Sequence, residues 1–355
     1  MVADSKYSNA SHSATRNVFH RAPAVTAPRQ HGRTAKSAEI RNCSVERTVN
    51  ILSDVWTFLV LTEIYLGSRR FDEIQAVLGL PRSTLSDRLG NLVSTGVLRR
   101  SCYSDTPARF EYRLTEMGRD LYLVTLSLLR FGDDWLSDGD PPLQLFHAPC
   151  GKACQPVTLC SACGGEIVAS DVAYRDGPGA GTSLARRPSQ RRRADGKDLY
   201  ERGRPSSVAR ALRIIGDRWT FLVLREAFFG IRRYHDMQVR LGIAPNILAD
   251  RLSRLIEGRI FAKRKYQESP ERFEYRLTDM GRALFLPMIE MLRFGDRWLS
   301  EAPPLILTHA ACGQDFLPVL SCDQCHQGLA ARAMRYRLRH DAGPKDRRRH
   351  PSRIA

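Results

Sequence analysis

Apolar residues recur at helical spacing four times in the first half of the chain. In the first of these segments Val45, Val49 and Leu52 lie three or four positions apart, which is the spacing of one helix face. Gly96 follows the third segment as a C′ glycine, and Thr115 precedes the fourth as an N-cap. The pattern predicts helices at residues 45–65, 71–78, 82–95 and 115–136.

Between the third and fourth predicted helices the pattern becomes that of a β-hairpin. Residues 97–103 and 109–114 are predicted to be two strands around the turn 104–107. A helix, a short helix, a tight turn, a helix and a hairpin, in this order, form the winged helix-turn-helix pattern. In that fold the third helix, here called the reading helix, packs one face inward and can present the other to a major groove about 12 Å wide.

The whole arrangement occurs twice. Residues 54–61 return as 217–224, and residues 110–119 return as 273–282, in both cases 163 positions later. A constant offset over this length indicates that a complete module was duplicated. We therefore expect a mainly α fold with small β wings, in which two winged helix-turn-helix domains are each followed by a small Cys-rich hairpin unit.

The candidate DNA contacts lie on the outward face of the reading helix and on the wing. They are Ser83, Thr84, Arg88, Arg99, Arg100 and Arg109 in the first repeat, and Asn246, Arg251, Lys263, Arg264, Lys265 and Arg272 in the second. Cations on a protruding hairpin suit contact with phosphate, although they could also be ordinary surface residues. Arg88 and Arg251 have another alternative, which is pairing with acidic neighbours on a solvated helix face. Trp56 and Trp219 are expected in the core.

A second repeated unit follows each module. Its candidate metal ligands are His147, Cys150, Cys160 and Cys163 in the first repeat, and His309, Cys312, Cys322 and Cys325 in the second. His-x₂-Cys followed by Cys-x₂-Cys supplies four ligands suited to tetrahedral zinc within each repeat, and with no open position such an ion would be structural. The alternative is a small hairpin with metal-free thiols. Cys154 and His326 lack counterparts and are expected to have no ligand role.

Most of the net charge of +17 lies outside the repeats. Residues 1–41, 171–204 and 332–355 carry net charges of +5, +4 and +7. Their composition predicts two basic tails and a flexible linker, which either add salt-sensitive attraction to phosphate or are simply solvated. The remaining ranges are the winged domains, 42–140 and 205–303, and the Cys-rich units, 141–170 and 304–331.

The chain lacks an apolar run of about 18 residues, so we expect no membrane span. Its polar N-terminus lacks a signal-peptide core, and a cytoplasmic location is expected. Nine cysteines in that setting indicate reduced thiols or metal ligands rather than a disulfide framework.

Each repeat resembles the HxlR-type winged helix-turn-helix transcriptional regulators of bacteria over about a hundred residues. In the first repeat the matching motifs are Cys43-Ser44-Val45-Glu46-Arg47, Trp56-Thr57, Arg70-Phe71-Asp72-Glu73-Ile74, Leu85-Ser86-Asp87-Arg88-Leu89 and the segment 110–118. The second repeat matches at Trp219-Thr220, 233–237, 249–252 and 273–275. The resemblance implies DNA-binding homodimers of one module per chain that repress or activate transcription.

Two departures from the family pattern affect these expectations. A side-chain N-cap is missing from both reading helices, because Pro81 and Ala244 stand where the family often has Ser. Cys43 aligns with a cysteine that is redox-active in some members, whereas the second repeat has Ser206 there. A thiol switch at Cys43 and a plain thiol therefore both remain open.

We expect a sequence-specific DNA-binding transcriptional regulator whose two fused domains act as an intrachain pseudo-dimer on double-stranded DNA. The runner-up is a homodimer with four reading helices. The alternative function is a metal- or redox-responsive regulator, in which the Cys units or Cys43 control DNA binding. The chain has no nucleophile elbow, P-loop or dinucleotide loop, so an enzyme is not expected.

The two reading helices differ in their outward residues. The second repeat replaces Ser83, Thr84 and Ser86 with Asn246, Ile247 and Ala249. The two domains should therefore prefer different half-sites, and the sequence predicts an operator that is an imperfect palindrome.

Overall fold

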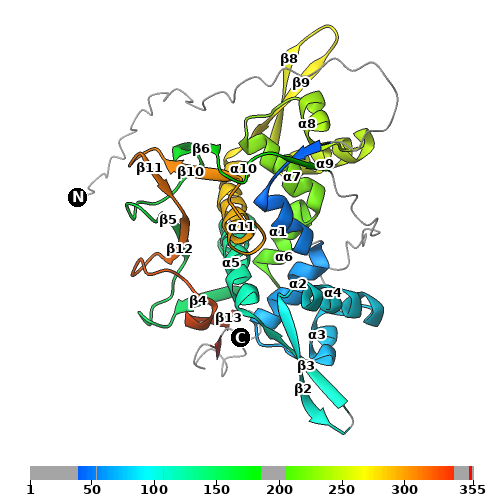
Figure 1. Cartoon of the computed structure of the whole chain (residues 1–355), viewed down its shortest axis with the longest axis vertical. Coiled ribbons are helices and arrows are strands. Elements are labelled where there is room, and N and C mark those ends of the chain that lie inside the picture. The colour runs from blue at the N-terminus through cyan, green and yellow to red at the C-terminus, as the bar shows by residue number, and fades with distance from the viewer. Residues whose placement is uncertain (1–38, 53, 107, 185–204, 340–351, 354–355) are drawn as a thin grey trace, which may run out of the picture.

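The computed structural model describes residues 39–52, 54–106, 108–184, 205–339 and 352–353 (Figure 1). The first repeat contains α1 (Ser44–Leu52), α2 (Val55–Tyr65), α3 (Phe71–Leu78), α4 (Arg82–Ser94), the wing strands β2 (Leu98–Asp105) and β3 (Ala108–Leu114), and α5 (Glu116–Leu136). The second contains α6 (Ser207–Ile215), α7 (Arg218–Phe228), α8 (Tyr234–Leu241), α9 (Pro245–Glu257), β8 (Phe261–Gln267), β9 (Arg272–Leu277), α10 (Asp279–Ala283) and α11 (Phe285–Trp298). The winged helix-turn-helix order predicted from the sequence is therefore present in both repeats.

Three predicted helices are interrupted. The segment 45–65 forms α1 and α2 rather than one helix, because the extended residue Asp54 caps α2 by accepting a hydrogen bond from the Thr57 N–H at 3.0 Å. Asp217 separates α6 from α7 in the same way. The last helix of the second repeat is divided into α10 and α11, since Pro287 lacks an N–H and its ring crowds the carbonyl of Ala283.

The reading helices α4 and α9 are packed as the apolar pattern predicted. Leu85, Leu89 and Leu92 of α4 have no exposed surface. Trp56 is buried, as predicted, while Trp219 is half-buried beneath the guanidinium of Arg218, 4.7 Å from the ring centroid. One continuous apolar core runs through both repeats, so the two domains are not separate packing units.

The two repeats contact each other through their helices in a symmetric way. α1 packs against α11, and α6 packs against α5. Helices approach closely at two equivalent glycines: a Cβ on Gly132 would lie 2.2 Å from the carbonyl oxygen of Ser207, and one on Gly295 would lie 2.3 Å from that of Ser44. A reciprocal pattern of this kind is the mark of an isologous interface.

The backbone also meets itself near the pseudo-two-fold axis. Asp54 and Asp217, which are equivalent residues, form an antiparallel bridge. Some inter-repeat ion pairs have no symmetric copy in sequence: for example, Asp120 of α5 accepts from Arg293 of α11 at 3.1 Å, whereas the counterpart of Asp120 is Ala283. The symmetry of the two repeats is therefore approximate.

The Cys-rich segments pair between the repeats as well as within them. The strands are β4 (Leu143–His147), β5 (Pro156–Cys160) and β6 (Val172–Asp176) from the first repeat, and β10 (Leu305–His309), β11 (Gln314–Phe316), β12 (Pro318–Cys322) and β13 (Met334–Leu338) from the second. β4 pairs with β13, β5 with β12 and β6 with β10, all antiparallel. Within a repeat, β10 pairs with β11, and isolated antiparallel bridges join Phe146 to Ala153, Leu159 to Glu166 and Ser321 to Gly328. The predicted units therefore keep hairpin turns within each repeat, but they are not self-contained, because their strands also pair with strands of the other repeat.

The predicted linker and tails contain strands as well. β6 and β7 (Thr182–Leu184) lie in the range predicted as linker, and β7 pairs with β1 (Glu39–Arg41). β13 and β14 (Ser352–Arg353) lie in the range predicted as the C-terminal tail. The sequence composition concealed these strands, because their ladder partners are distant in the chain. Residues 1–38, 185–204 and 340–351 lie outside the described residues.

None of the helices in the described part of the chain is both long and apolar enough to cross a membrane.

Candidate DNA-contacting surface and cysteine clusters

The two winged domains lie at opposite ends of the molecule. In Figure 1 the wing β2–β3 extends from the lower end and the wing β8–β9 from the upper end, while the strands that carry the cysteine clusters lie on the left and α4 and α9 on the right. Both reading helices begin without a side-chain cap, at Pro81 and Ala244, as the sequence predicted. In the second repeat this is partly offset by Pro245 at the first helical position, where its fixed φ suits a helix start.

The short polar residues predicted on the reading helices have accessible side chains. Ser83 and Asn246 are exposed, and Thr84 is half-buried. They lie at the N-terminal end of their helices, the part that contacts base edges in helix-turn-helix proteins. Their role as DNA contacts stays a prediction.

The structure places Arg88 and Arg251 differently from the prediction. Only 8% of the Arg88 surface is exposed, and its Nε donates to Asp54 at 3.1 Å. Arg251 repeats this contact, with its Nε donating to Asp217 at 2.9 Å. Each arginine therefore links a reading helix to the N-cap of the preceding long helix. The pairing favours the alternative that the sequence left open, an acidic partner for each arginine, and a DNA contact by Arg88 or Arg251 stays an untested prediction.

The predicted wing cations are all exposed: Arg99, Arg100, Arg109, Lys263, Arg264, Lys265 and Arg272. Arg100 lies over the ring of Phe110 at 3.5 Å from the centroid, and Lys263 lies over Phe273 at 3.9 Å. Such contacts hold a cation at the wing surface without neutralising it. Lys265 is different, because it donates to Glu268 at 3.2 Å and to Glu271 at 2.6 Å. The hydrogen bond to Glu271, and to a smaller extent the one to Glu268, raises the pKa of Lys265. Both carboxylates compete with any phosphate for the ammonium group.

Sequence reasoning missed one pair of cations beside the wings. Arg70 lies over the ring of Tyr103, with 4.5 Å to the centroid, and Arg233 lies over Tyr266 at 4.7 Å. The two arginines and the two tyrosines are equivalent residues in the repeats. The sequence did offer a signal for this pair: the arginine and the tyrosine are identical in both repeats, whereas the helix residues that follow the arginine differ.

The eight predicted metal ligands come together in two groups, but not in the predicted groups. The first cluster is His147, Cys150, Cys322 and Cys325, and the second cluster is Cys160, Cys163, His309 and Cys312. Each cluster thus combines the His-x₂-Cys pair of one repeat with the Cys-x₂-Cys pair of the other. The expected grouping within a repeat is wrong because β4, β5 and β6 pair with strands of the second repeat.

The ligand atoms of each cluster are close and converge. In the first cluster the Nδ1 of His147 lies 3.3 Å from the Sγ of Cys325 and 3.6 Å from that of Cys150. In the second cluster the Nδ1 of His309 lies 3.3 Å from the Sγ of Cys163 and 3.5 Å from that of Cys312. Within each cluster all ligand atoms lie within 4.8 Å of one another.

Tight turns bring each Cys-x₂-Cys pair to one point. The backbone N–H of Ala162 donates to the Sγ of Cys160 at 3.4 Å, and that of Gln324 donates to Cys322 at the same distance. The residue after the second cysteine has a left-handed backbone in both repeats: Gly164 has φ 71° and its counterpart His326 has φ 58°. His326 therefore serves the turn through its backbone, although its side chain has no predicted ligand role.

The remaining cysteines lie outside the two clusters. Cys43 is 6% exposed and lies beside the buried Arg225. Burial lowers the pKa of Arg225, but the interactions with Cys43 and Glu226 outweigh burial and raise it. Its assignment as a redox thiol stays a prediction. Cys154 is buried, which raises the pKa of its thiol, and Cys102 is exposed on β2.

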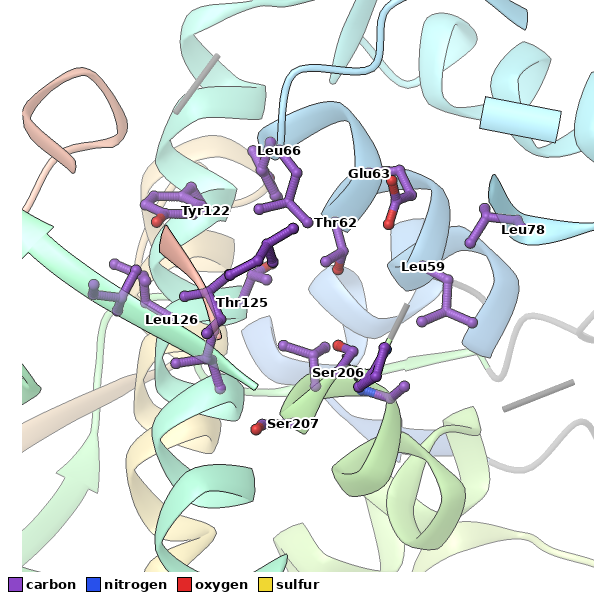
Figure 2. Close-up of a pocket in the computed structure, with 18 residues that line it drawn as sticks. Leu59, Thr62, Glu63, Leu66, Leu78, Tyr122, Thr125, Leu126, Ser206 and Ser207 are labelled. Atoms are coloured by element: carbon purple, nitrogen blue, oxygen red, sulfur yellow. Dashed lines mark hydrogen bonds between the residues drawn. The ribbon is translucent and has the colours of Figure 1, made fainter. Parts of the chain in front are cut away.

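An apolar cavity of about 60 Å³ lies between the repeats (Figure 2). Figure 2 shows side chains of α2 and α5, such as Leu59 and Thr125, facing Ser206 and Ser207 at the start of α6. The position equivalent to Thr62, which lines the cavity, is Arg225 in the second repeat, and its guanidinium pairs with Glu226 at 2.7 Å. The two halves of the interface are therefore filled by different chemistry.

Comparison with known proteins agrees with the geometry of the two domains. The family described as "HxlR-like helix-turn-helix" matches residues 51–140 and again residues 214–303. An uncharacterized HTH-type transcriptional regulator of Mycobacterium bovis is 43% identical over 143 residues, which are 40% of this chain and 90% of that protein. One from Synechocystis is 36% identical over 95 residues, which are 26% of this chain and 70% of that protein.

Among solved structures, the reduced form of the transcriptional regulator YodB from B. subtilis is 27% identical, with a TM-score of 0.24. The match covers 27% of this chain and 94% of that one. The regulator of Mycobacterium bovis has the length of about one repeat, whereas this chain carries the module twice. The chain therefore belongs to the HxlR-like helix-turn-helix family.

Proposed function

We propose that the chain is a sequence-specific DNA-binding transcriptional regulator in which the two repeats act as one intrachain pseudo-dimer. The observation that carries this proposal is the reciprocal packing of α1 on α11 and α6 on α5, which relates two winged domains by an approximate two-fold axis. A two-fold protein matches a two-fold operator, so two domains in one chain suffice for both half-sites.

The contacts that we propose fall into two classes. Ser83, Thr84 and Asn246, at the starts of the reading helices, would contact base edges. The exposed wing cations would contact phosphate or the minor groove, with Arg109 and Arg272 at equivalent positions 163 residues apart. Lys265 would contribute less, because Glu268 and Glu271 already hold it.

Selection from a random DNA pool, at moderate salt and with nonspecific competitor, tests the proposal. We expect two half-sites that differ in sequence, with centres about one helical turn or a multiple of it apart. Recovery of a perfect palindrome would contradict the difference between the reading helices, and recovery of no site would contradict specific binding.

A helix-swap variant makes this test sharper. Replacing Asn246→Ser, Ile247→Thr and Ala249→Ser gives α9 the outward residues of α4. The selected half-sites should then become more alike. A matched control with three replacements at exposed positions of α8 should leave the selected site unchanged.

The oligomeric state separates the pseudo-dimer from the runner-up, a homodimer with four reading helices. Light scattering of the protein bound to a selected operator should give one chain per site. Two chains on one operator would favour the homodimer.

A metal-responsive regulator is the second candidate, with structural zinc in the clusters. One observation favours it: each cluster contains residues of both repeats, and binding to two half-sites depends on the relative position of the repeats. It predicts that a chelator weakens operator binding, and that added zinc restores it. Unchanged operator binding after complete metal removal would exclude the metal-responsive regulator and favour a regulator whose DNA binding is independent of metal.

A further inference from the structure

Both cysteine clusters are built from two segments that lie far apart in the chain. Cys150 is 172 positions from Cys322, and their sulfur atoms lie 4.0 Å apart. In the second cluster Cys160 and Cys312 are 152 positions apart and their sulfur atoms are also separated by 4.0 Å. A disulfide requires about 2.05 Å between the sulfurs, so these contacts are not disulfides.

The distances are those of a four-coordinate site. Bonds of about 2.3 Å to sulfur and about 2.0 Å to nitrogen, at tetrahedral angles, put two sulfurs roughly 3.8 Å apart and a sulfur and a nitrogen roughly 3.5 Å apart. The observed separations, 4.0 Å between sulfurs and 3.3–3.6 Å between a sulfur and the His Nδ1, are close to these two expected distances. Three thiolates and one imidazole form a donor set that selects zinc among common divalent ions.

Four protein ligands leave no open coordination position, and two ligands of each cluster are buried while the other two are half-buried or exposed. His147 and Cys322 in the first cluster, and His309 and Cys160 in the second, are each at most 2% exposed. The ligand pairs are anchored by strands: His147 is in register with Met334, and His309 with Val172. Each pairing joins the two repeats next to the ligand, so the ligands of one cluster are held by backbone from both repeats.

We propose that the chain binds two Zn²⁺ ions, one in each cluster, and that each ion clasps one repeat to the other. The ions then fix the exchanged strands on the side of the molecule away from α4 and α9 (Figure 1). This proposal does not depend on DNA binding, because the amount of zinc bound per chain can be measured without DNA.

Two variants that each lose one histidine and three cysteines distinguish shared sites from sites within a repeat. The first is His147→Ala, Cys150→Ser, Cys322→Ser and Cys325→Ser, which removes the whole first cluster and leaves the second intact. The second is His147→Ala, Cys150→Ser, Cys160→Ser and Cys163→Ser, which leaves half of each cluster.

Zinc per purified chain is the readout. We expect two ions in the wild type, one in the first variant and none in the second. Sites within each repeat would give the reverse order for the two variants, and a wild type without zinc would overturn the proposal outright. Cys102→Ser and Cys154→Ser, which lie outside the clusters, should keep both ions.

A measurement on the unaltered chain covers the case in which the variants do not fold. After partial removal of zinc with a limiting chelator, free thiols are alkylated and the chains are analysed by mass spectrometry. Cys150 should become alkylated together with Cys322 and Cys325, and Cys160 together with Cys163 and Cys312. Joint alkylation of Cys150 with Cys160 and Cys163 would contradict shared sites.

Discussion

Phe58 and Phe221 occupy equivalent positions in the two repeats and stack on each other, with ring centroids 6.1 Å apart and an angle of 25° between the planes. Equivalent residues meet in this way where a two-fold axis passes between them. The duplication therefore produced two halves that use each other as partners.

The close approach of α5 and α6 depends on Gly132. We expect Gly132→Ala to destabilise the fold, because the added Cβ would lie 2.2 Å from the carbonyl oxygen of Ser207. Overpacking of this kind typically costs about 1–3 kcal/mol, although Ala itself favours a helix over Gly. Chemical denaturation gives the free energy of unfolding. Gly90→Ala is the control, since nothing lies within 4 Å of its Cβ and it should stabilise α4 by up to about 1 kcal/mol.

Arg88 should matter for stability rather than for DNA affinity. Arg88→Met removes the partner of Asp54, which is 27% exposed, and we expect a loss of roughly 2–3 kcal/mol in the free energy of unfolding. Arg109→Ala on the exposed wing is the comparison, with unchanged stability and weaker DNA binding. The assignment of Arg88 to the interior would be wrong if its variant kept full stability and lost DNA affinity.

The wing cations should control the salt dependence of binding. Arg109→Ala and Arg272→Ala should each lower the slope of log K against log salt by about one, as expected for one lost phosphate contact. Lys265→Ala should change the slope less, because its ammonium already pairs with Glu268 and Glu271. Binding titrations at several salt concentrations give the slopes, and equal effects for all three would count against the assignment of Lys265.

Two carboxyl groups at the inter-repeat contact should make stability depend on pH. Burial raises the pKa of Asp133 to about 6 and that of Asp296 to about 6, while hydrogen bonds from Ser207 and Ser44 oppose the shift. The unfolded value is about 3.9. Because the folded pKa is the higher one, the protonated groups contribute stability that is complete below pH about 4 and is lost as the pH rises through 6.

The measurement is the free energy of unfolding between pH 4 and 7. Asp133→Asn with Asp296→Asn should remove a decline on the order of 2 kcal/mol per group, relative to the wild type. A residual decline is expected from Glu290, whose pKa burial raises to about 7. Gly90→Ala, which changes no titratable group, should keep the shape of the wild-type profile, and identical profiles for all the variants would contradict this account.

Much of the fold followed from local pattern. The short helix 71–78, the reading helix and the wing have strong periodicity and turn signals, and each was found within a residue or two. The break at Asp54 was missed, because an acidic N-cap within a continuous apolar stripe gives little local warning. The guanidinium of Arg88 was assigned to the surface because its buried partner, Asp54, lies 34 positions away.

The cysteine sites were predictable as a set but not as groups. Spacing of two residues identifies ligand pairs, and both pairs of each repeat are present in the clusters. Which pair joins which depends on β4–β13 and β5–β12 pairing, and that is a property of tertiary structure. A duplicated sequence offers the chain two equally plausible groupings, so sequence reasoning alone cannot choose between them.

The exchange of strands also imposes an order on biosynthesis. β4 is made early but pairs with β13, whose last residue is Leu338, so its ladder remains open until the second repeat has been synthesised. The wing and the short helices of the first repeat make contacts that are local in sequence, whereas α1, α5 and the cysteine pairs wait for their partners in the second repeat. A chain stopped between the repeats would expose unpaired strand edges and half of each cysteine cluster.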